Sequence, residues 1–184
     1  MPGDDVAVAL ELLASAGPVA VEYTVEIGVA PEGYREAMAS VGRDPGDPTV
    51  TRYTGTVDYR LRRATFECDD ETVYRVEGYR TWLHELGEPV RTPPNGDIVW
   101  FPNVIWILDL LADPEDVTAD GGRLRLAISD GPMRRRPGVT WLGRWLRPPA
   151  MTLTCEVDGA GRIASVTGAY QVVRFALTLG YDER

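Results

Sequence analysis

Residues 19–29 place an apolar side chain at every second position of an unusually long run. Polar residues, among them Glu22, Thr24 and Glu26, occupy positions between the apolar ones. A period of two over this length predicts a β-strand with one face buried and the other in water. The chain is therefore expected to build a sheet with one apolar face.

The same alternation returns in several later segments, and turn residues separate these segments from one another. Short alternating runs joined by turns predict an antiparallel meander. Asp158-Gly159-Ala160-Gly161 is typical of a hairpin turn between the two strands that flank it. The predicted strands cover residues 53–61, 64–68, 72–79 with a possible extension over 80–85, 124–128, 151–157, 162–170 and 173–179.

Two segments have helical spacing instead. Val6, Leu10 and Leu13 lie three or four residues apart, and Gly17-Pro18 provides a stop signal, which predicts a short N-terminal helix. Residues 103–112 are expected to form a buried central helix that ends before Pro114, because proline disfavours helix at the preceding residue. Its shared face would consist of Val104, Ile105, Leu108 and Leu111.

The remaining segments are predicted to be loops. Glycines and prolines mark residues 31–49, with a possible helical turn at 34–41, and a second loop begins at Pro89 and reaches Gly96. The acidic residues Asp69, Asp70 and Glu71 are expected in a solvated turn, and Asp113, Glu115 and Asp116 in a solvated loop.

This order of elements predicts the α+β class: a curved, half-barrel-like antiparallel sheet with an N-terminal helix and a central helix packed on it. A length of 184 residues fits a single domain covering residues 1–184. Two helices can cover only part of such a sheet, so the uncovered face either closes on itself or encloses a cavity.

Composition excludes several classes of function. The net charge of −9 argues against general nucleic-acid binding, which needs a cationic face. Every one of the nineteen cations is arginine, so the chain has no lysine for Schiff-base or phosphate chemistry. Arginine without lysine, in a Gly-, Ala- and Val-rich chain, is typical of a GC-rich bacterial genome. No basic region precedes an apolar core at the start, so we expect a cytoplasmic protein, or an exported one if a leader has been removed.

No catalytic or metal-binding constellation emerges, so we expect neither an enzyme nor a cofactor or metal. His84 is the single histidine; no nucleophile elbow surrounds it, and one histidine is poor for zinc. The glycines at 159 and 161 superficially fit a dinucleotide fingerprint, but a strand follows them where that motif needs a helix. Cys68 and Cys155 are expected to be buried thiols, with a disulfide possible only if their strands meet.

Residues 131–149 carry five arginines and no acid. Trp141 and Trp145 lie four residues apart there, beside leucines. Arginines beside exposed aromatics suggest peripheral membrane contact through the segment from Arg134 to Arg147, or a lid over an apolar cavity. The alternative is a long loop whose tryptophans pack on the domain. Trp100 and Trp106 are expected in the core, with a cavity lining as the alternative.

The order of elements also resembles a known family. A helix leads into a long strand, then a meander with Glu71-Thr72-Val73-Tyr74, a central segment over residues 100–111, and a strand pair that turns within residues 156–163. This is similar to the LolA/LppX-type lipoprotein carriers. The resemblance implies a half-barrel with a cavity for a lipid or acyl chain, and no ligand residue is carried over. Such carriers are exported or lipid-anchored, and neither a leader nor a lipidated cysteine is visible here.

The resulting functional expectation is non-catalytic binding of an apolar small molecule or lipid. One alternative is an acidic interaction or inhibitor protein, similar to an immunity protein, with a protein partner. Another is an enzyme that uses carboxylates or tyrosines in a barrel-like cavity. The candidate ligand-binding residues are Tyr59, Tyr74, Trp100, Trp106, Trp141 and Trp145.

Overall fold

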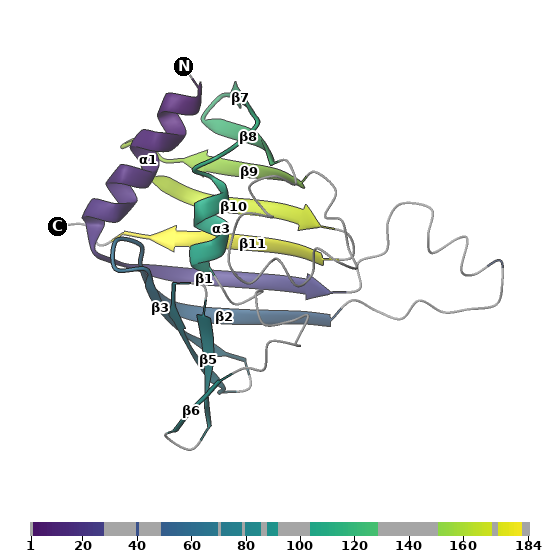
Figure 1. The fold of residues 1–184 in the computed structure, drawn as a ribbon. Helices are drawn as coiled ribbons and strands as arrows, with labels where there is room; N and C mark the ends of the chain where they lie inside the picture. Colours follow the sequence, from purple (N-terminus) through teal and green to yellow (C-terminus); the bar gives the residue numbers. More distant parts are fainter. Residues whose placement is uncertain are drawn as a thin grey trace.

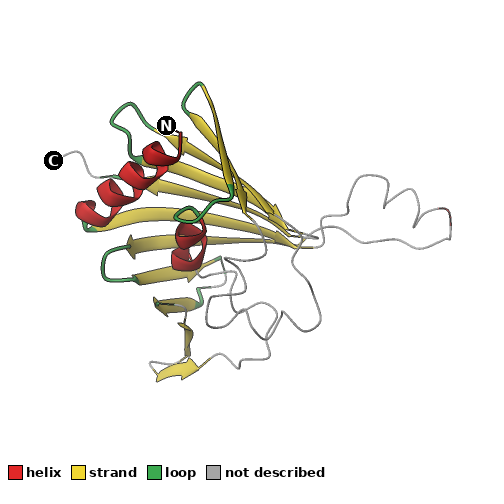
Figure 2. Ribbon diagram, turned by 45° about the horizontal axis from the view of Figure 1, so that its top comes forward, coloured by secondary structure: helices red, strands yellow, loops and turns green. Residues whose placement is uncertain are grey.

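In a computed structural model, one antiparallel sheet carries two helices on one face (Figures 1 and 2). The structure describes residues 2–27, 40, 49–69, 71–78, 80–85, 88–91, 104–128, 151–170 and 173–181. The predicted α+β class, with two helices packed on a curved antiparallel sheet, is confirmed. The helices are α1 (Pro2–Ala16) and α3 (Val104–Leu110). The strands are β1 (Pro18–Ile27), β2 (Thr49–Asp58), β3 (Arg63–Cys68), β4 (Val73–Glu77), β5 (Arg80–Glu85), β6 (Glu88–Arg91), β7 (Asp116–Asp120), β8 (Arg123–Ile128), β9 (Met151–Val157), β10 (Ile163–Tyr170) and β11 (Val173–Gly180).

The first and last strands lie side by side in the middle of the sheet. The strand order is β6-β5-β4-β3-β2-β1-β11-β10-β9-β8-β7. Strand β1 pairs with β2 over its whole length on one side and with β11 on the other. The sheet is therefore two meanders that join at the β1–β11 pair (Figure 1).

The apolar positions predicted from alternation fall on one face of the sheet, here called the inner face. The register places them opposite one another from strand to strand, so they form continuous rows. The helices cover this face (Figure 2), and the side chains that point outwards on the other face are largely threonine, serine, glutamate and arginine. One row, buried throughout, consists of Leu124, Cys155, Val166, Leu177, Tyr23 and Tyr53.

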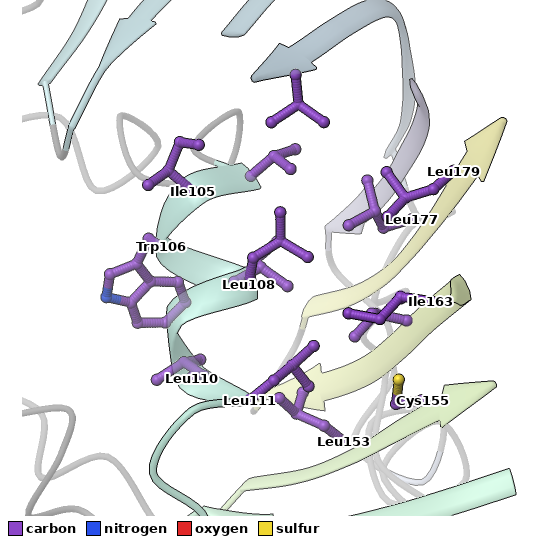
Figure 3. Close-up of a cluster of buried hydrophobic side chains, with 14 of the residues drawn as sticks. Ile105, Trp106, Leu108, Leu110, Leu111, Leu153, Cys155, Ile163, Leu177 and Leu179 are labelled. Atoms are coloured by element: carbon purple, nitrogen blue, oxygen red, sulfur yellow. The ribbon is translucent and has the colours of Figure 1, made fainter. Parts of the chain in front are cut away.

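Every side chain of α3 is buried, not only the predicted face. Figure 3 shows Leu108 and Leu111 directed toward Leu153 and Leu177 on the strands. Full burial of one such side chain contributes about 1.5–3 kcal/mol. Packing of this kind stabilises a helix that would be too short to persist alone.

Helix α1 follows its prediction closely. Val6, Leu10 and Leu13 are buried against the sheet. Gly17 ends the helix with a φ of 78°, a left-handed conformation that glycine adopts without a steric penalty, and Pro18 then starts β1.

At two glycines of the inner face, neighbouring atoms lie so close that an added Cβ would overlap them. A Cβ on Gly168 would lie 2.5 Å from Cζ of Phe175, so the phenyl ring occupies the place of a side chain there. A Cβ on Gly55 would lie 1.9 Å from the backbone oxygen of Thr65 on β3. The inner face at these points is formed by backbone and neighbouring rings.

The prediction that the strand beginning at Tyr53 continues to Leu61 is wrong. Strand β2 ends at Asp58, whose Oδ1 accepts a hydrogen bond from the backbone N–H of Leu61 at 2.9 Å. Arg62 then adopts a positive φ of 55°, and Leu61 is 54% exposed. An aspartate that binds the backbone a few residues ahead favours a turn, and here this local bond ends the alternation.

Three further boundaries differ from expectation. Residues 72–85 form two strands, β4 and β5, because Gly78 turns the chain with a φ of 59°. Pro89 lies in β6 and not in a loop; β6 is an edge strand, where a missing N–H is tolerated. Asp116 begins strand β7 instead of ending an acidic loop, although its side chain is exposed as expected. The possible helical turn at residues 34–41 falls almost wholly outside the described residues.

Candidate functional site

A groove of about 350 Å³ opens between α1 and the chain that leaves α3. Its walls are mainly apolar. Glu11 adds a carboxylate to the lining, and Tyr59 enters it from the turn after β2. The apolar lining residues include Val6, Ala7, Leu10, Ala14 and Leu111.

The Tyr59 side chain is held by the one buried charged residue among those described, Asp109 of α3. The Tyr59 hydroxyl donates to Oδ1 of Asp109 at 2.9 Å. Arg62 donates from Nη2 to Oδ2 at 2.6 Å and from Nη1 to Oδ1 at 3.2 Å. A buried carboxylate is costly unless charged and polar donors surround it. This Tyr59–Arg62–Asp109 cluster thus fastens α3 to the β2–β3 turn and orients Tyr59 beside the groove.

The positive φ of Arg62 contributes to this arrangement. The backbone oxygen of Arg62 accepts a hydrogen bond of 2.7 Å from the N–H of Gly78. The β2–β3 turn is therefore bound both to α3 and to the β4–β5 turn, which makes it a rigid support for Tyr59.

A second feature of the inner face is a group of aromatic rings, here called the aromatic cluster. The rings of Tyr23 and Tyr53 stack with centroids 5.7 Å apart, and Tyr74 meets Tyr53 edge-on at 5.8 Å. Phe66 and Phe175 flank the tyrosines at 6.4 and 6.5 Å. Burial raises the pKa of Tyr23 well above its usual value, so this phenol stays neutral.

A hollow of about 430 Å³ lies on the opposite, outer face of the sheet. Threonines line it, among them Thr24, Thr154 and Thr167. Glu26 on β1 lies directly opposite Arg174 on the neighbouring strand β11, and both also line the hollow. Threonine hydroxyls and the charged Glu26 and Arg174 give this hollow more polar groups than the groove beside α1 has, although Phe175, Ala169 and Ala176 also line it.

The structure does not bring the described candidate residues together. Tyr59 lines the groove, whereas Tyr74 belongs to the aromatic cluster. Trp106 is buried in α3, as the core interpretation predicts, on the side of the helix away from Leu153 in Figure 3. Trp100, Trp141 and Trp145, together with the arginine-rich segment from Arg134 to Arg147, lie outside the described residues. The membrane contact and the lid stay predictions.

Sequence reasoning missed the residues that build the groove. Val6 and Leu10 were expected only as positions of the N-terminal helix, and no role was predicted for Arg62, which lies between two predicted strands. Asp109 did carry a signal, since it is the single charged residue in the apolar run of α3. Such a residue needs a donor from elsewhere in the chain, and Arg62 and Tyr59 provide it across a sequence separation of 47 and 50 residues.

Both cysteines are free thiols, Cys155 buried and Cys68 half-buried. They lie on different meanders, on β9 and β3. Burial raises the pKa of Cys155 to about 12, so its thiol is inert at neutral pH. Among the described residues, no three His, Cys, Asp or Glu side chains gather as a metal site, and none of the helices described is long and apolar enough to cross a membrane. His84 lies on β5, and its side chain is outside the described part of the chain.

No family model and no curated protein matches the chain. Among solved structures, the lipoprotein LppX of Mycobacterium tuberculosis is similar with a TM-score of 0.48 and 14% identity, covering 98% of this chain and 96% of LppX. LprF of Mycobacterium bovis is similar with a TM-score of 0.44 and 12% identity over 97% and 91% of the two chains. A LolA-superfamily protein of Nitrosomonas europaea has a TM-score of 0.43 and 10% identity over 100% and 94%.

The names above describe the matched proteins themselves. The matches do not support the expected cytoplasmic location of this protein. With TM-scores below 0.5 and identities below 25%, these are similarities to solved structures, and the resemblance to LolA/LppX-type lipoprotein carriers stays a prediction.

Proposed function

We propose that this protein binds a small apolar molecule, such as an acyl chain, without chemical conversion, in the groove between α1 and α3. The observation that carries the proposal is the groove itself, with its apolar walls on the helix-covered face. Its volume of about 350 Å³ falls at the lower end of small-molecule sites, which run to roughly 300–1,000 Å³. Val6, Leu10 and Leu111 supply the apolar contacts.

The polar groups of the groove favour a neutral ligand. Glu11 lines the groove, and the chain as a whole is strongly acidic. A carboxylate in the ligand would be repelled by Glu11, whereas an alcohol could donate a hydrogen bond to it. Decan-1-ol should therefore bind more tightly than decanoate.

The first experiment is native mass spectrometry of freshly purified protein, which reveals any lipid retained from the cells. Titration calorimetry with decan-1-ol then tests the groove directly. Ala7→Trp places a large side chain in the groove from α1. The control Val8→Trp introduces the same residue at the next position of the helix, which is 53% exposed and does not line the groove. We expect Ala7→Trp to weaken binding at least tenfold and Val8→Trp to leave it unchanged. Equal binding by the wild type and Ala7→Trp would refute the proposal.

A further inference from the structure

Strand β7 is an edge of the sheet whose backbone has β8 as its one strand neighbour among the described residues (Figure 1). Asp116, Thr118, Ala119 and Asp120 are exposed, and Val117 is half-buried. An edge strand presents N–H and C=O groups that can pair with another extended chain.

The register identifies which groups point away from β8. Gly121 and Gly122, with φ values of 54° and 86°, form a two-residue turn between Asp120 and Arg123. In such hairpins the residues that flank the turn bond to each other and the pattern then alternates. The N–H and C=O groups of Val117 and Ala119 are therefore directed outwards, toward an added strand.

The side chains of β7 give this edge a distinct charge. Val117 and Ala119 lie opposite the buried Leu126 and Leu124, so they belong to the inner face. Asp116, Thr118 and Asp120 consequently point to the outer face. The exposed acids Asp113 and Glu115 precede the strand and make the edge more negative.

The two arginines on β8 offset only part of the charge of the four acids Asp113, Glu115, Asp116 and Asp120. Arg123, opposite Asp120, donates from Nε to Glu156 at 2.6 Å on the far side. Arg125 lies opposite Thr118. An added strand would lie about 4.8 Å outside β7 and one strand further from both arginines.

We propose that the β7 edge accepts an extended, cationic segment of a partner protein by strand addition. The matching segment carries arginine or lysine at two positions four residues apart, opposite Asp116 and Asp120, with small apolar residues opposite Val117 and Ala119. The same edge rejects a second copy of this chain: an antiparallel β7–β7 pair centred on Thr118 places Asp116 opposite Asp120, and like charges in that position are destabilising.

The test uses the full chain and the heptapeptide Thr-Arg-Ala-Thr-Val-Arg-Thr. One matched peptide carries glutamate in place of both arginines, and a second carries N-methyl groups on its alanine and valine, which removes the donors that would face β7. Amide hydrogen exchange followed by NMR reports on Val117 and Ala119 individually.

We expect the arginine peptide to slow exchange at Val117 and Ala119, and both matched peptides to bind at least tenfold more weakly. The variant Asp116→Lys/Asp120→Lys should instead prefer the glutamate peptide. Glu22→Lys/Glu67→Lys makes the same charge change at exposed positions on β1 and β3 and should keep the original preference. Equal binding of the N-methylated peptide, no slowing at Val117 and Ala119, or no binding would each overturn the proposal.

Discussion

Arg62 and Asp109, 47 residues apart in the chain, face each other as a charged pair with Nη2 of Arg62 2.6 Å from Oδ2 of Asp109. The two side chains differ in exposure: that of Asp109 is 9% exposed and that of Arg62 is 41% exposed. The arginine thus reaches in from the surface to a carboxylate that α3 has carried into the interior. Removing the arginine would leave a buried charge with fewer donors.

Arg62→Met should therefore lower the free energy of unfolding by about 1–3 kcal/mol, the cost of leaving a buried acceptor short of its donors. Urea denaturation measures this loss. Arg63→Met is the matched control: Arg63 lies 3.9 Å from Glu77, both side chains are more than 60% exposed, and such pairs contribute little. Similar losses of stability in the two variants would show that the Arg62–Asp109 pair stabilises the fold no more than the exposed Arg63–Glu77 pair does.

Gly168→Ala should destabilise the protein by about 1–3 kcal/mol, because the new methyl would overlap the ring of Phe175 and the Cδ2 atom of Leu153, 2.6 Å away. The second substitution Phe175→Val makes room for it. The loss in the double variant should then be smaller than the sum of the two single losses, by roughly 0.5 kcal/mol or more. Additive losses in thermal unfolding would contradict this contact.

Gly55→Ala should be more harmful than Gly168→Ala, since its Cβ would overlap a backbone atom, the oxygen of Thr65, that cannot rotate away. We expect a loss of about 3 kcal/mol or more. Gly159→Ala, in the β9–β10 turn, meets no atom within 4 Å and should stay within about 0.5 kcal/mol of the wild type. Comparable stability of the two variants would argue against the close β2–β3 approach.

The β9–β10 turn should weaken in acid. Asp158 accepts hydrogen bonds from the backbone N–H groups of Arg162 and Ala160 and from Nε of Arg162, and these bonds hold its pKa below the usual value of 3.8. A carboxylate with a lowered pKa stabilises the fold above its unfolded-state pKa and loses that contribution as the pH falls through its folded-state pKa. Asp158→Asn should cost about 1 kcal/mol at pH 7. The difference from wild type should shrink as the pH is lowered below 3.8; a deficit independent of pH would contradict the assignment.

Cys155 should resist alkylation in the folded protein. Burial raises its pKa to about 12, so at pH 8 only about one thiol in ten thousand is ionised, and the side chain is shielded as well. Iodoacetamide followed by peptide mapping should modify Cys68 first and Cys155 only after denaturation. Cys68→Ala provides the control, in which the native protein should stay unlabelled. Rapid labelling of Cys155 at pH 8 would show that β9 opens readily.

Local patterns were sufficient for much of this fold. The alternation of residues 19–27 placed Val21, Tyr23 and Val25 on the inner face, and the spacing of Val6, Leu10 and Leu13 placed α1. These predictions depend only on neighbours along the chain. The turn after Asp58 was missed because one hydrogen bond decides it, and apolar alternation continues past it through Tyr59 and Leu61. The turn at Gly78 was missed because the φ of one glycine decides it.

The candidate site was harder to predict than the fold. Tyr59 lines a groove, but its orientation depends on Asp109, which is far away in the sequence, and its role in ligand binding stays a prediction. Tyr74 and Trp106 are aromatic, as many ligand-binding residues are, but their rings pack with other buried groups. Composition cannot distinguish a ring that lines a cavity from one that fills the core, because both must be apolar.

The pairing of β1 with β11 also affects how the chain can fold during synthesis. Of the strands that the structure describes, the two at the centre of the sheet are the earliest and the latest along the chain. The meander from β1 to β6 can assemble early, but the long edge of β1 stays without its partner strand until β11 has been translated. Contacts between such distant segments raise the contact order and slow folding. Until β11 has been made, the sheet is incomplete and part of its apolar face is exposed, and exposed surface of this kind favours aggregation.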